Sequence, residues 1–143
     1  MKIPRLSTDD EKVIKAAHKA IEEYREAVTK GYTPERLLNI LERLSMAYVY
    51  LGEIEAVYNM DTAEAYFNRL IARAKGVQKK LLAKEKISAI NGTIDNDIEG
   101  ERFMEVTTSH LAERITNLQR GISKIISAIE RRLVFLRDER KQL

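Results

Sequence analysis

The chain of 143 residues contains no cysteine, and it has only six glycines and two prolines. Without cysteine there is no disulfide, no thiol catalysis and no Cys-ligated zinc or iron–sulfur site. So few glycines and prolines argue against an all-β, loop-rich or collagen-like chain. The longest uninterrupted apolar run, Met46 to Leu51, is far shorter than the roughly 20 residues that span a bilayer. We therefore expect a soluble cytoplasmic protein with no membrane partner.

Apolar residues make up 44% of the chain and charged residues 33%, which suits one folded domain over residues 1–143. The apolar positions recur at helical spacing. A capping box of Thr8 and Glu11 predicts the start of a first helix, and Gly31 predicts its end. Thr33 and Pro34 predict the start of a second helix, because Pro fits the first turn.

Asp61-Thr62-Ala63-Glu64 reads as another helix start, so a break or bend is predicted near residue 60. The third helix is predicted to run to Ile90, and residues 91–100 are predicted to form a loop because of Asn91-Gly92 and the acidic residues that follow. The last helix is predicted from Glu101 to near Arg140. Heptad spacing predicts the seam of the third helix at Phe67, Leu70, Ala74, Val77 and Leu81. The seam of the last helix is predicted at Leu111, Ile115, Leu118, Ile122, Ile125, Ile129, Leu133 and Leu136.

Two heptad helices joined by a short connection should fold back on each other. The predicted fold class is therefore all-α: a long antiparallel helical hairpin, coiled-coil-like, with two shorter N-terminal helices packed on it. The predicted last helix is longer than its partner. Its surplus must pack on the first two helices or on another subunit, and we predict an oligomer interface at Ile125, Ile129, Leu133, Phe135 and Leu136.

Charge is segregated along the chain. Residues 65–90 hold seven basic side chains against Glu85 alone, and residues 91–112 hold five acidic side chains against Arg102 alone. Two basic helices side by side would offer a positive surface to a phosphate backbone. The predicted nucleic-acid-binding residues are Arg69, Arg73, Lys75, Lys79, Lys80, Lys84, Lys86, Arg120, Lys124 and Arg131. The alternative is the solvated face of an ordinary coiled coil, although such a face usually alternates its charges.

No motif in the sequence indicates catalysis. The Gly-rich phosphate loops and the GxSxG elbow are missing. The only two histidines, His18 and His110, do not form the paired Glu-x-x-His motifs of a di-iron bundle. The acidic stretch 95–105 lacks the ligand order of an EF-hand loop. We expect no catalytic residue, no metal site, no cofactor and no enzymatic activity.

One part of the sequence resembles a known family. The segment from Ala83 to Gly92 ends a basic helix before an acidic stretch, and a long helix containing Ile126-Ser127-Ala128-Ile129-Glu130 follows. Over about residues 65–140 this pattern resembles the T-even phage recombination mediators (UvsY-like). In that family a basic helical segment ends in a small-residue–Gly stop, which Lys84, Lys86 and Gly92 match. The family's aromatic pair before the stop is Ala89-Ile90 here.

The resemblance implies a small helical protein that forms ring-like oligomers and binds single-stranded DNA. It also implies partners, namely a RecA-type recombinase and a single-strand-binding protein, and the host cytoplasm as the location if a phage encodes the chain. The function predicted is thus a non-enzymatic, homo-oligomeric, single-stranded-DNA-binding protein. The alternative is a structural assembly module, such as a virion connector, scaffold or adaptor subunit, that binds protein instead.

Overall fold

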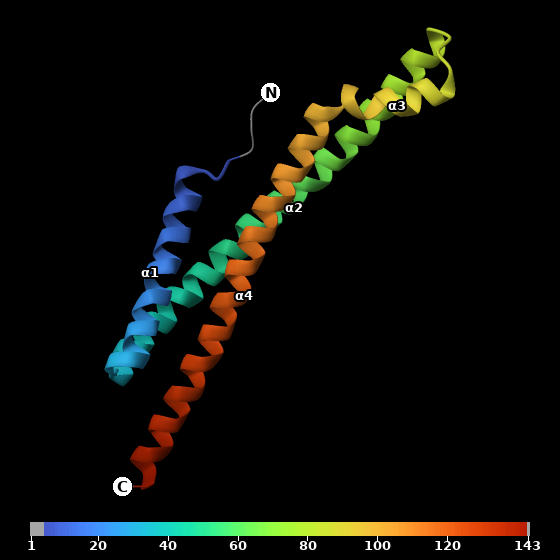
Figure 1. Cartoon of the computed structure of the whole chain (residues 1–143). Helices are drawn as coiled ribbons and strands as arrows, with labels where there is room; N and C mark the ends of the chain where they lie inside the picture. The colour runs from blue at the N-terminus through green and yellow to red at the C-terminus, as the bar shows by residue number, and fades with distance from the viewer. Residues whose placement is uncertain (1–4, 143) are drawn as a thin grey trace. The chain divides into compact units, whose positions relative to one another are not determined.

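The computed structural model describes residues 5–142, and the described part contains four helices and no strand. They are α1 (Thr8–Lys30), α2 (Pro34–Leu82), α3 (Ile87–Asp97) and α4 (Glu99–Gln142) (Figure 1). The long helices α2 and α4 pack against each other, which confirms the prediction of an all-α fold built on a helical hairpin.

The contacts divide the described chain into two compact units. Unit 1 comprises Arg5 and Ala56–Glu113, so it contains the second half of α2, all of α3 and the start of α4. Unit 2 comprises Leu6–Glu55 and residues 114–142, so it contains α1, the first half of α2 and the rest of α4. The expectation of a single domain over residues 1–143 stays a prediction.

The helix starts follow the predicted capping chemistry closely. Ser7, and not Thr8, is the N-cap of α1, because its hydroxyl accepts a hydrogen bond from the backbone N–H of Asp10 at 3.1 Å. The prediction was therefore one residue too late. Gly31 ends α1 as predicted, with a φ of 109° that disfavours any residue carrying a Cβ. Thr33 caps α2 as predicted, accepting from the N–H of Arg36 at 3.2 Å.

Of the break or bend predicted near residue 60, the break is wrong, because α2 is one continuous helix of 49 residues; the bend stays a prediction. The hydroxyl of Thr62 donates back to the carbonyl of Tyr58 at 2.8 Å, so this residue lies inside a helix and does not cap a new one. No glycine or proline interrupts the backbone here. The hairpin consequently carries one separate N-terminal helix, α1, and the two predicted N-terminal helices become α1 and the first half of α2.

The predicted loop at 91–100 is also wrong. The helix expected to reach Ile90 ends at Leu82, and α3 occupies most of the expected loop. Ile90, Ile94 and Ile98 recur every four residues and are almost completely buried. Burial of this apolar row outweighs the turn preference of Asn91-Gly92, so tertiary packing overrides the local signal.

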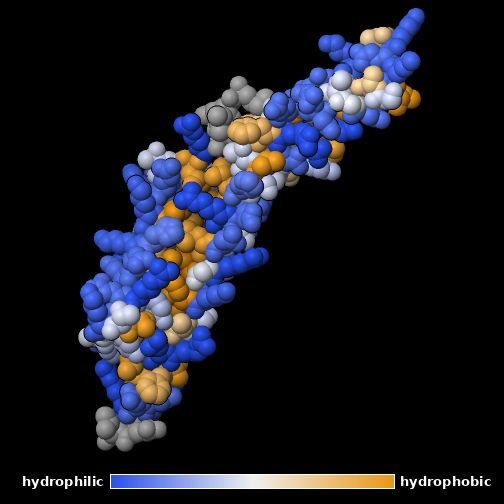
Figure 2. Space-filling model, viewed as in Figure 1, coloured by the Kyte–Doolittle hydropathy of each residue, from blue (hydrophilic) through white to orange (hydrophobic). Residues whose placement is uncertain are grey.

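Unit 2 has a three-helix core. In the view of Figure 2, apolar side chains of this unit gather in a band with polar side chains on both sides. Each helix contributes an inward row at helical spacing, as predicted for α4. The buried residues include Ile14, Ala17, Ala20, Ile21 and Ala27 from α1, Leu37, Ile40, Leu44, Ala47 and Leu51 from α2, and Ile115, Ile122 and Ile129 from α4.

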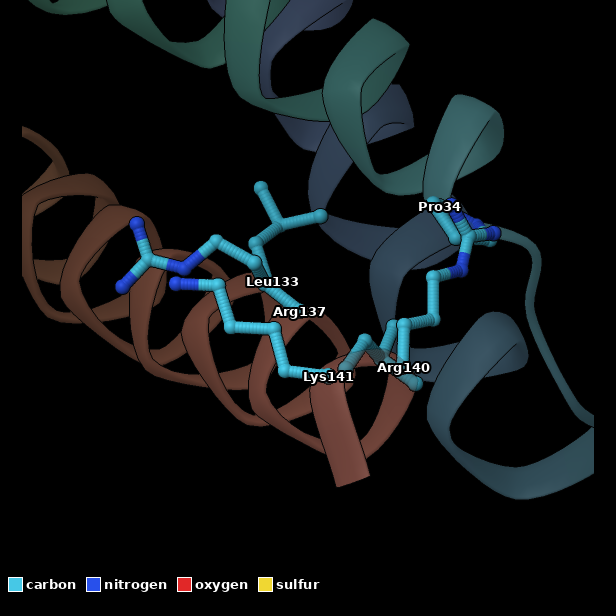
Figure 3. Close-up of a pocket in the computed structure, with 6 residues that line it drawn as sticks. Pro34, Leu133, Arg137, Arg140 and Lys141 are labelled. Carbon is cyan, nitrogen blue, oxygen red and sulfur yellow. The ribbon is translucent and has the colours of Figure 1, made fainter. Parts of the chain in front are cut away.

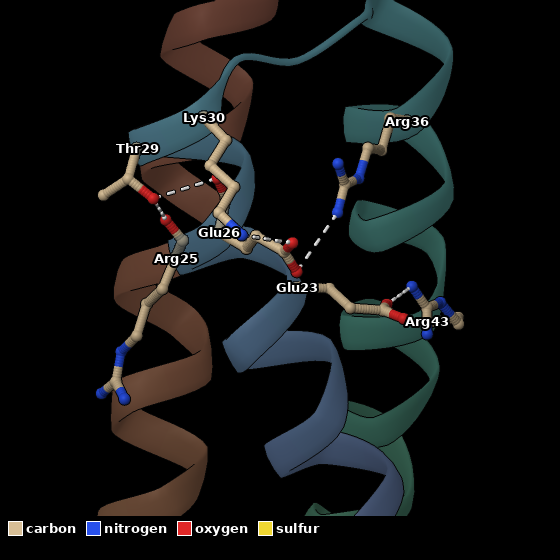
Figure 4. Close-up of polar contacts among 7 residues, drawn as sticks. All are labelled: Glu23, Arg25, Glu26, Thr29, Lys30, Arg36 and Arg43. Atoms are coloured by element: carbon tan, nitrogen blue, oxygen red, sulfur yellow. Dashed lines mark hydrogen bonds and ion pairs between the residues drawn. The ribbon is translucent and has the colours of Figure 1, made fainter.

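Ion pairs on the surface of unit 2 join α1 to α2 (Figure 4). Arg43 pairs with Glu23, and Arg36 lies 3.9 Å from Glu26. Glu26 also pairs with Lys30 one turn later on α1, at 3.3 Å. The two pairs of Glu26 are the more solvated, so each stabilises the unit by only about 0.2–1 kcal/mol, whereas Arg43 and Glu23 are partly buried. Their main consequence is to favour one register between the two helices.

Arg132 of α4 is held by two tyrosines of unit 2. Its Nε donates to the hydroxyl of Tyr24, and its Nη1 donates to the hydroxyl of Tyr32, both at 3.3 Å. Its guanidinium also lies 5.6 Å from the ring centre of Tyr32. The hydrogen bond with Tyr32, followed by that with Tyr24, raises the pKa of Arg132 above its usual value. The residue therefore stays charged at every physiological pH and ties α4 to the end of α1.

In unit 1, α3 packs on the face of α2 that carries small residues. A Cβ added to Gly76 would lie only 2.5 Å from Cδ1 of the fully buried Ile94 of α3, and Ala65 on the same side of α2 is buried as well. The seam predicted from Phe67 to Leu81 is therefore wrong as the packing face, since Phe67 and Leu81 are exposed. Small side chains let helices approach closely, whereas the larger ones on the opposite side would hold α3 away.

Adding a methyl group at two glycines should have opposite effects. Gly76→Ala should lower the free energy of unfolding, because overpacking against Ile94 costs about 1–3 kcal/mol and outweighs a helix-propensity gain of up to about 1 kcal/mol. Gly121→Ala should raise it by up to about 1 kcal/mol, since nothing lies within 4 Å of its added Cβ. Urea denaturation followed by circular dichroism checks both variants. Equal stabilisation by both would contradict the close approach of α3.

Candidate nucleic-acid interface

The ten predicted nucleic-acid-binding residues fall in both units. Seven lie in unit 1, on the second half of α2 and the turn that follows it, and three lie in unit 2, on α4. The seven divide further by their contacts. Three face carboxylates of their own unit, and four make no ion pair among the described residues.

Arg69, Arg73 and Lys80 point toward the acidic side chains of α3 and α4. Arg69 pairs with Glu105, and Arg73 lies 3.1 Å from Asp95. Lys80 lies 3.0 Å from Asp97 and donates to the hydroxyl of Thr93 at 2.6 Å. It is the most enclosed of the three, with 18% of its side chain exposed. These three cations are thus neutralised within unit 1.

This arrangement explains the charge segregation of the sequence. Residues 65–90 lack carboxylates at helical contact spacing because their partners come from residues 95–105, brought alongside by the turn after α2. Such pairing across a hairpin is the ordinary structural reason for opposite charge blocks. Arg69, Arg73 and Lys80 therefore have a structural role, as partners in ion pairs, that needs no nucleic acid.

Four lysines remain available to a ligand, and we call Lys75, Lys79, Lys84 and Lys86 the turn lysines. All four are exposed, and none makes an ion pair within the described part of the chain. Lys75 and Lys79 lie one helical turn apart near the end of α2, whereas Lys84 and Lys86 lie in the connection to α3. All four are lysines, and they fall within residues 75–86, at the end of α2 and in the connection to α3.

The connection itself is a Schellman motif. The N–H of Glu85 donates to the carbonyl of Lys80 at 3.1 Å, and the N–H of Lys84 donates to that of Leu81 at 3.0 Å. Lys84 therefore takes the left-handed position, with a φ of 60°. Glycine usually fills this position, because a residue with a Cβ costs roughly 1–2 kcal/mol there. A lysine held in this conformation at an exposed turn suggests a use for its charge.

Replacing Lys84 by glycine should separate stability from binding. Lys84→Gly should raise the free energy of unfolding by about 1 kcal/mol, because the left-handed strain disappears. The same variant should bind a single-stranded oligonucleotide more weakly, because one phosphate contact contributes about 0.7 to the slope of log K against log salt. If this contact vanishes near 1 M salt, the loss of affinity at 50 mM salt is about eightfold. Lys84→Ala serves as the control, since it removes the charge and keeps the strain. Tighter binding by Lys84→Gly would contradict a phosphate contact at this residue.

The three basic residues of unit 2 follow one side of α4. Arg120, Lys124 and Arg131 are exposed and make no ion pair among the described residues. The Nε of Arg131 donates to the carbonyl of Ser127 one turn earlier, at 3.3 Å. They form a second basic stripe, in unit 2, whereas the turn lysines belong to unit 1.

The predicted oligomer interface on α4 is only partly at the surface. Ile129 is completely buried in the core of unit 2, so it does not face a second copy. Ile125, Leu133 and Leu136 are half-buried, and Phe135 is 63% exposed. Helical periodicity does not distinguish residues that pack within the chain from those that pack between chains, which accounts for the mixture.

A shallow pocket of about 290 Å³ lies beside this segment (Figure 3). It is lined by the apolar residues Pro34, Leu133 and Leu136 and by three cations: Arg137, Arg140 and Lys141. These three cations were not among the binding residues predicted from the sequence. A run of positive charge in the last turns of α4 was the sequence feature that could have pointed to them. The same position also explains them without a ligand, because positive side chains stabilise a helix C-terminus.

The described residues show no centre for metal chemistry. Both His18 and His110 are exposed, and residues 5–142 contain no group of three histidines or carboxylates that suits a metal ion. No helix in this range is long and apolar enough to cross a membrane. Comparison of the chain with family models, with curated proteins and with solved structures yields no match.

Proposed function

We propose that this protein is a non-enzymatic, oligomeric protein that binds single-stranded DNA, in the manner of the recombination mediators that its sequence resembles. The observation that carries the proposal is the cluster of turn lysines. Four exposed lysines without ion pairs among the described residues fall within residues 75–86, at the end of α2 and in the turn to α3, and Lys84 holds a left-handed conformation.

The chemistry of the cluster suits phosphate groups. Lysine is a mobile, strongly hydrated point charge, whereas arginine offers the planar fork that reads guanine edges. An all-lysine cluster therefore favours contacts with the backbone over readout of bases. Its affinity would come mainly from the release of counterions, so binding should tolerate changes of sequence and weaken steeply with salt.

The biological role proposed follows from the resemblance alone. A mediator of this kind would help to place a RecA-type recombinase on strands covered by a single-strand-binding protein. The cluster at the α2–α3 turn would hold the strand, and the remaining helical surfaces would contact the protein partners. The choice of single strands over duplexes rests on the same resemblance.

The alternative function is a structural assembly module, such as a virion connector, scaffold or adaptor subunit. One observation favours it: the side of α2 opposite to α3 carries large exposed apolar residues, among them Met60, Phe67 and Ile71. Exposed apolar surface at helical spacing is typical of protein–protein contacts. Such a module would use this surface and would not need the turn lysines.

A titration with a labelled single-stranded oligonucleotide at 50 and 200 mM salt separates the two functions. Four phosphate contacts, at about 0.7 each in the salt slope, predict affinity about 50-fold weaker at the higher salt. An oligonucleotide of unrelated sequence should bind equally well, and the matched duplex tests the preference for single strands. No binding at 50 mM salt would overturn the nucleic-acid proposal and favour the assembly module.

A further inference from the structure

The outer side of α2 in unit 1 is apolar and uncovered. Met60 is 73% exposed, Phe67 60% and Ile71 51%, and Val57, Ala74 and Leu81 are exposed as well. At 100° per residue this side lies opposite to Ala65 and Gly76, which pack inward. We call these six apolar residues the outer stripe. No described residue of unit 1 covers it, although a water-soluble helix usually buries such a row.

The outer stripe has the spacing of a coiled coil. Its members recur at the a and d positions of three and a half heptads, from Val57 to Leu81. Glu64 and Gln78 occupy the two remaining core positions. α2 thus has two packing faces, one with small residues used by α3 and one with large residues that fit a helix from another chain. We infer that the outer stripe pairs with the same stripe of a second copy, with the two α2 helices antiparallel.

Charge along the stripe selects the antiparallel direction. Asp61 and Lys75 occupy equivalent flanking positions two heptads apart, both are exposed, and neither has an ion pair among the described residues. In an antiparallel pair whose core layers are centred on residue 69, Asp61 of each copy lies beside Lys75 of the other. The same ion pair therefore forms twice across the interface. The same alignment places Phe67 against Ile71 and Val57 against Leu81 across the two copies.

A parallel pair fits the same residues poorly. It would stack Glu64 against Glu64 in one core layer, which brings two carboxylates together in an apolar seam. The residues flanking Lys75 in the partner would be apolar, so no ion pair would form. In the antiparallel pair each Glu64 instead faces the small Ala74 of the other copy. The stripe is therefore self-complementary under a two-fold axis, as an isologous interface requires.

Mass measurements test the pairing. The wild-type protein should sediment at twice 16.5 kDa or more, and Phe67→Glu should reduce it toward the monomer. Phe103→Glu is the matched control, because Phe103 is similarly exposed in unit 1 but lies on α4 outside the outer stripe. A monomeric wild type at micromolar concentration would overturn the inference. So would dissociation by Phe135→Glu with none by Phe67→Glu, since assembly would then use the end of α4.

A charge swap and cross-linking test the direction, and they do not depend on a core substitution that alters folding. Asp61→Lys or Lys75→Asp alone should weaken the dimer, and the double variant should restore it. The described chain has no cysteine, so introduced thiols are unique. A mixture of Asp61→Cys and Lys75→Cys proteins should form a disulfide between the two variants, and neither alone should cross-link. Cross-linking of Lys75→Cys with itself would overturn the antiparallel arrangement.

Discussion

Changing Lys79, Lys84 and Lys86 together to glutamate should nearly abolish binding to a single-stranded oligonucleotide. Each residue is exposed and makes no ion pair among the described residues, so its charge is available to a phosphate. Three lost contacts should flatten the slope of log K against log salt by about 2. If such contacts vanish near 1 M salt, the same slope corresponds to affinity about 500-fold weaker at 50 mM salt. Fluorescence anisotropy at several salt concentrations measures both quantities.

The control variant changes the same charge elsewhere. Lys12, Lys15 and Lys19 are exposed on α1 in unit 2, among the acidic residues of its first turn and of its middle. Reversing all three should weaken binding much less, because that surface has little positive potential. Circular dichroism of both triple variants should match the wild type. Equal loss of affinity in the two variants would show that net charge controls binding and that the turn lysines have no special role.

Much of the fold was predictable from local signals. The caps at Thr33 and Gly31 and the inward row of α4 were visible in the sequence because each depends on residues within a few turns. Capping chemistry and helical period act over that short range. The all-α class followed from the same signals.

The errors came from contacts over longer range. α3 forms where Asn91-Gly92 predicted a loop, because Ile90 and Ile94 are buried in unit 1. The spacing of Ile90, Ile94 and Ile98 was visible locally, but the surface of α2 near Gly76 that buries this row is distant in the sequence. Likewise, Thr62 resembles a helix start, yet the helix continues through it and its hydroxyl bonds to the preceding turn.

The candidate site was predicted only in part for a related reason. Charge counts located a basic segment, but they did not tell which cations face carboxylates. Lys79 and Lys80 are neighbours in the sequence, yet Lys79 is exposed whereas Lys80 is enclosed by α3. Which side of α2 packs inward decides this difference. α2 carries two stripes that could pack inward. The stripe of small residues does so, because small side chains permit a closer approach of α3.

Of Lys79 and Lys80, Lys80 is the residue whose replacement should change stability most. Lys80→Glu should lower the free energy of unfolding of unit 1 by about 2–3 kcal/mol. The new carboxylate would face Asp97, now 3.0 Å from Lys80, and Glu85, now 3.8 Å from it. Breaking a fully buried ion pair costs about 3–5 kcal/mol, and the value expected here is smaller because half of Asp97 is exposed to water.

α3 is the element most sensitive to this change. It has 11 residues, fewer than the roughly 12–15 that an isolated helix needs, so it depends on its contacts with α2. Hydrogen exchange should therefore show faster exchange of α3 amides in Lys80→Glu than in the wild type. Lys79→Glu, with the same change of charge at an exposed position, should alter stability by less than about 0.5 kcal/mol.

Two further variants connect the loss to the ion pair itself. Lys80→Met keeps the aliphatic stem and adds no charge, so it should cost about 1 kcal/mol, between the wild type and Lys80→Glu. Lys80→Glu combined with Asp97→Lys reverses the pair and should recover part of the lost stability and of the amide protection in α3. If Lys79→Glu and Lys80→Glu exchanged at the same rate throughout α3, Lys80 would have no structural role. All seven basic residues of unit 1 would then again be candidates for binding phosphate.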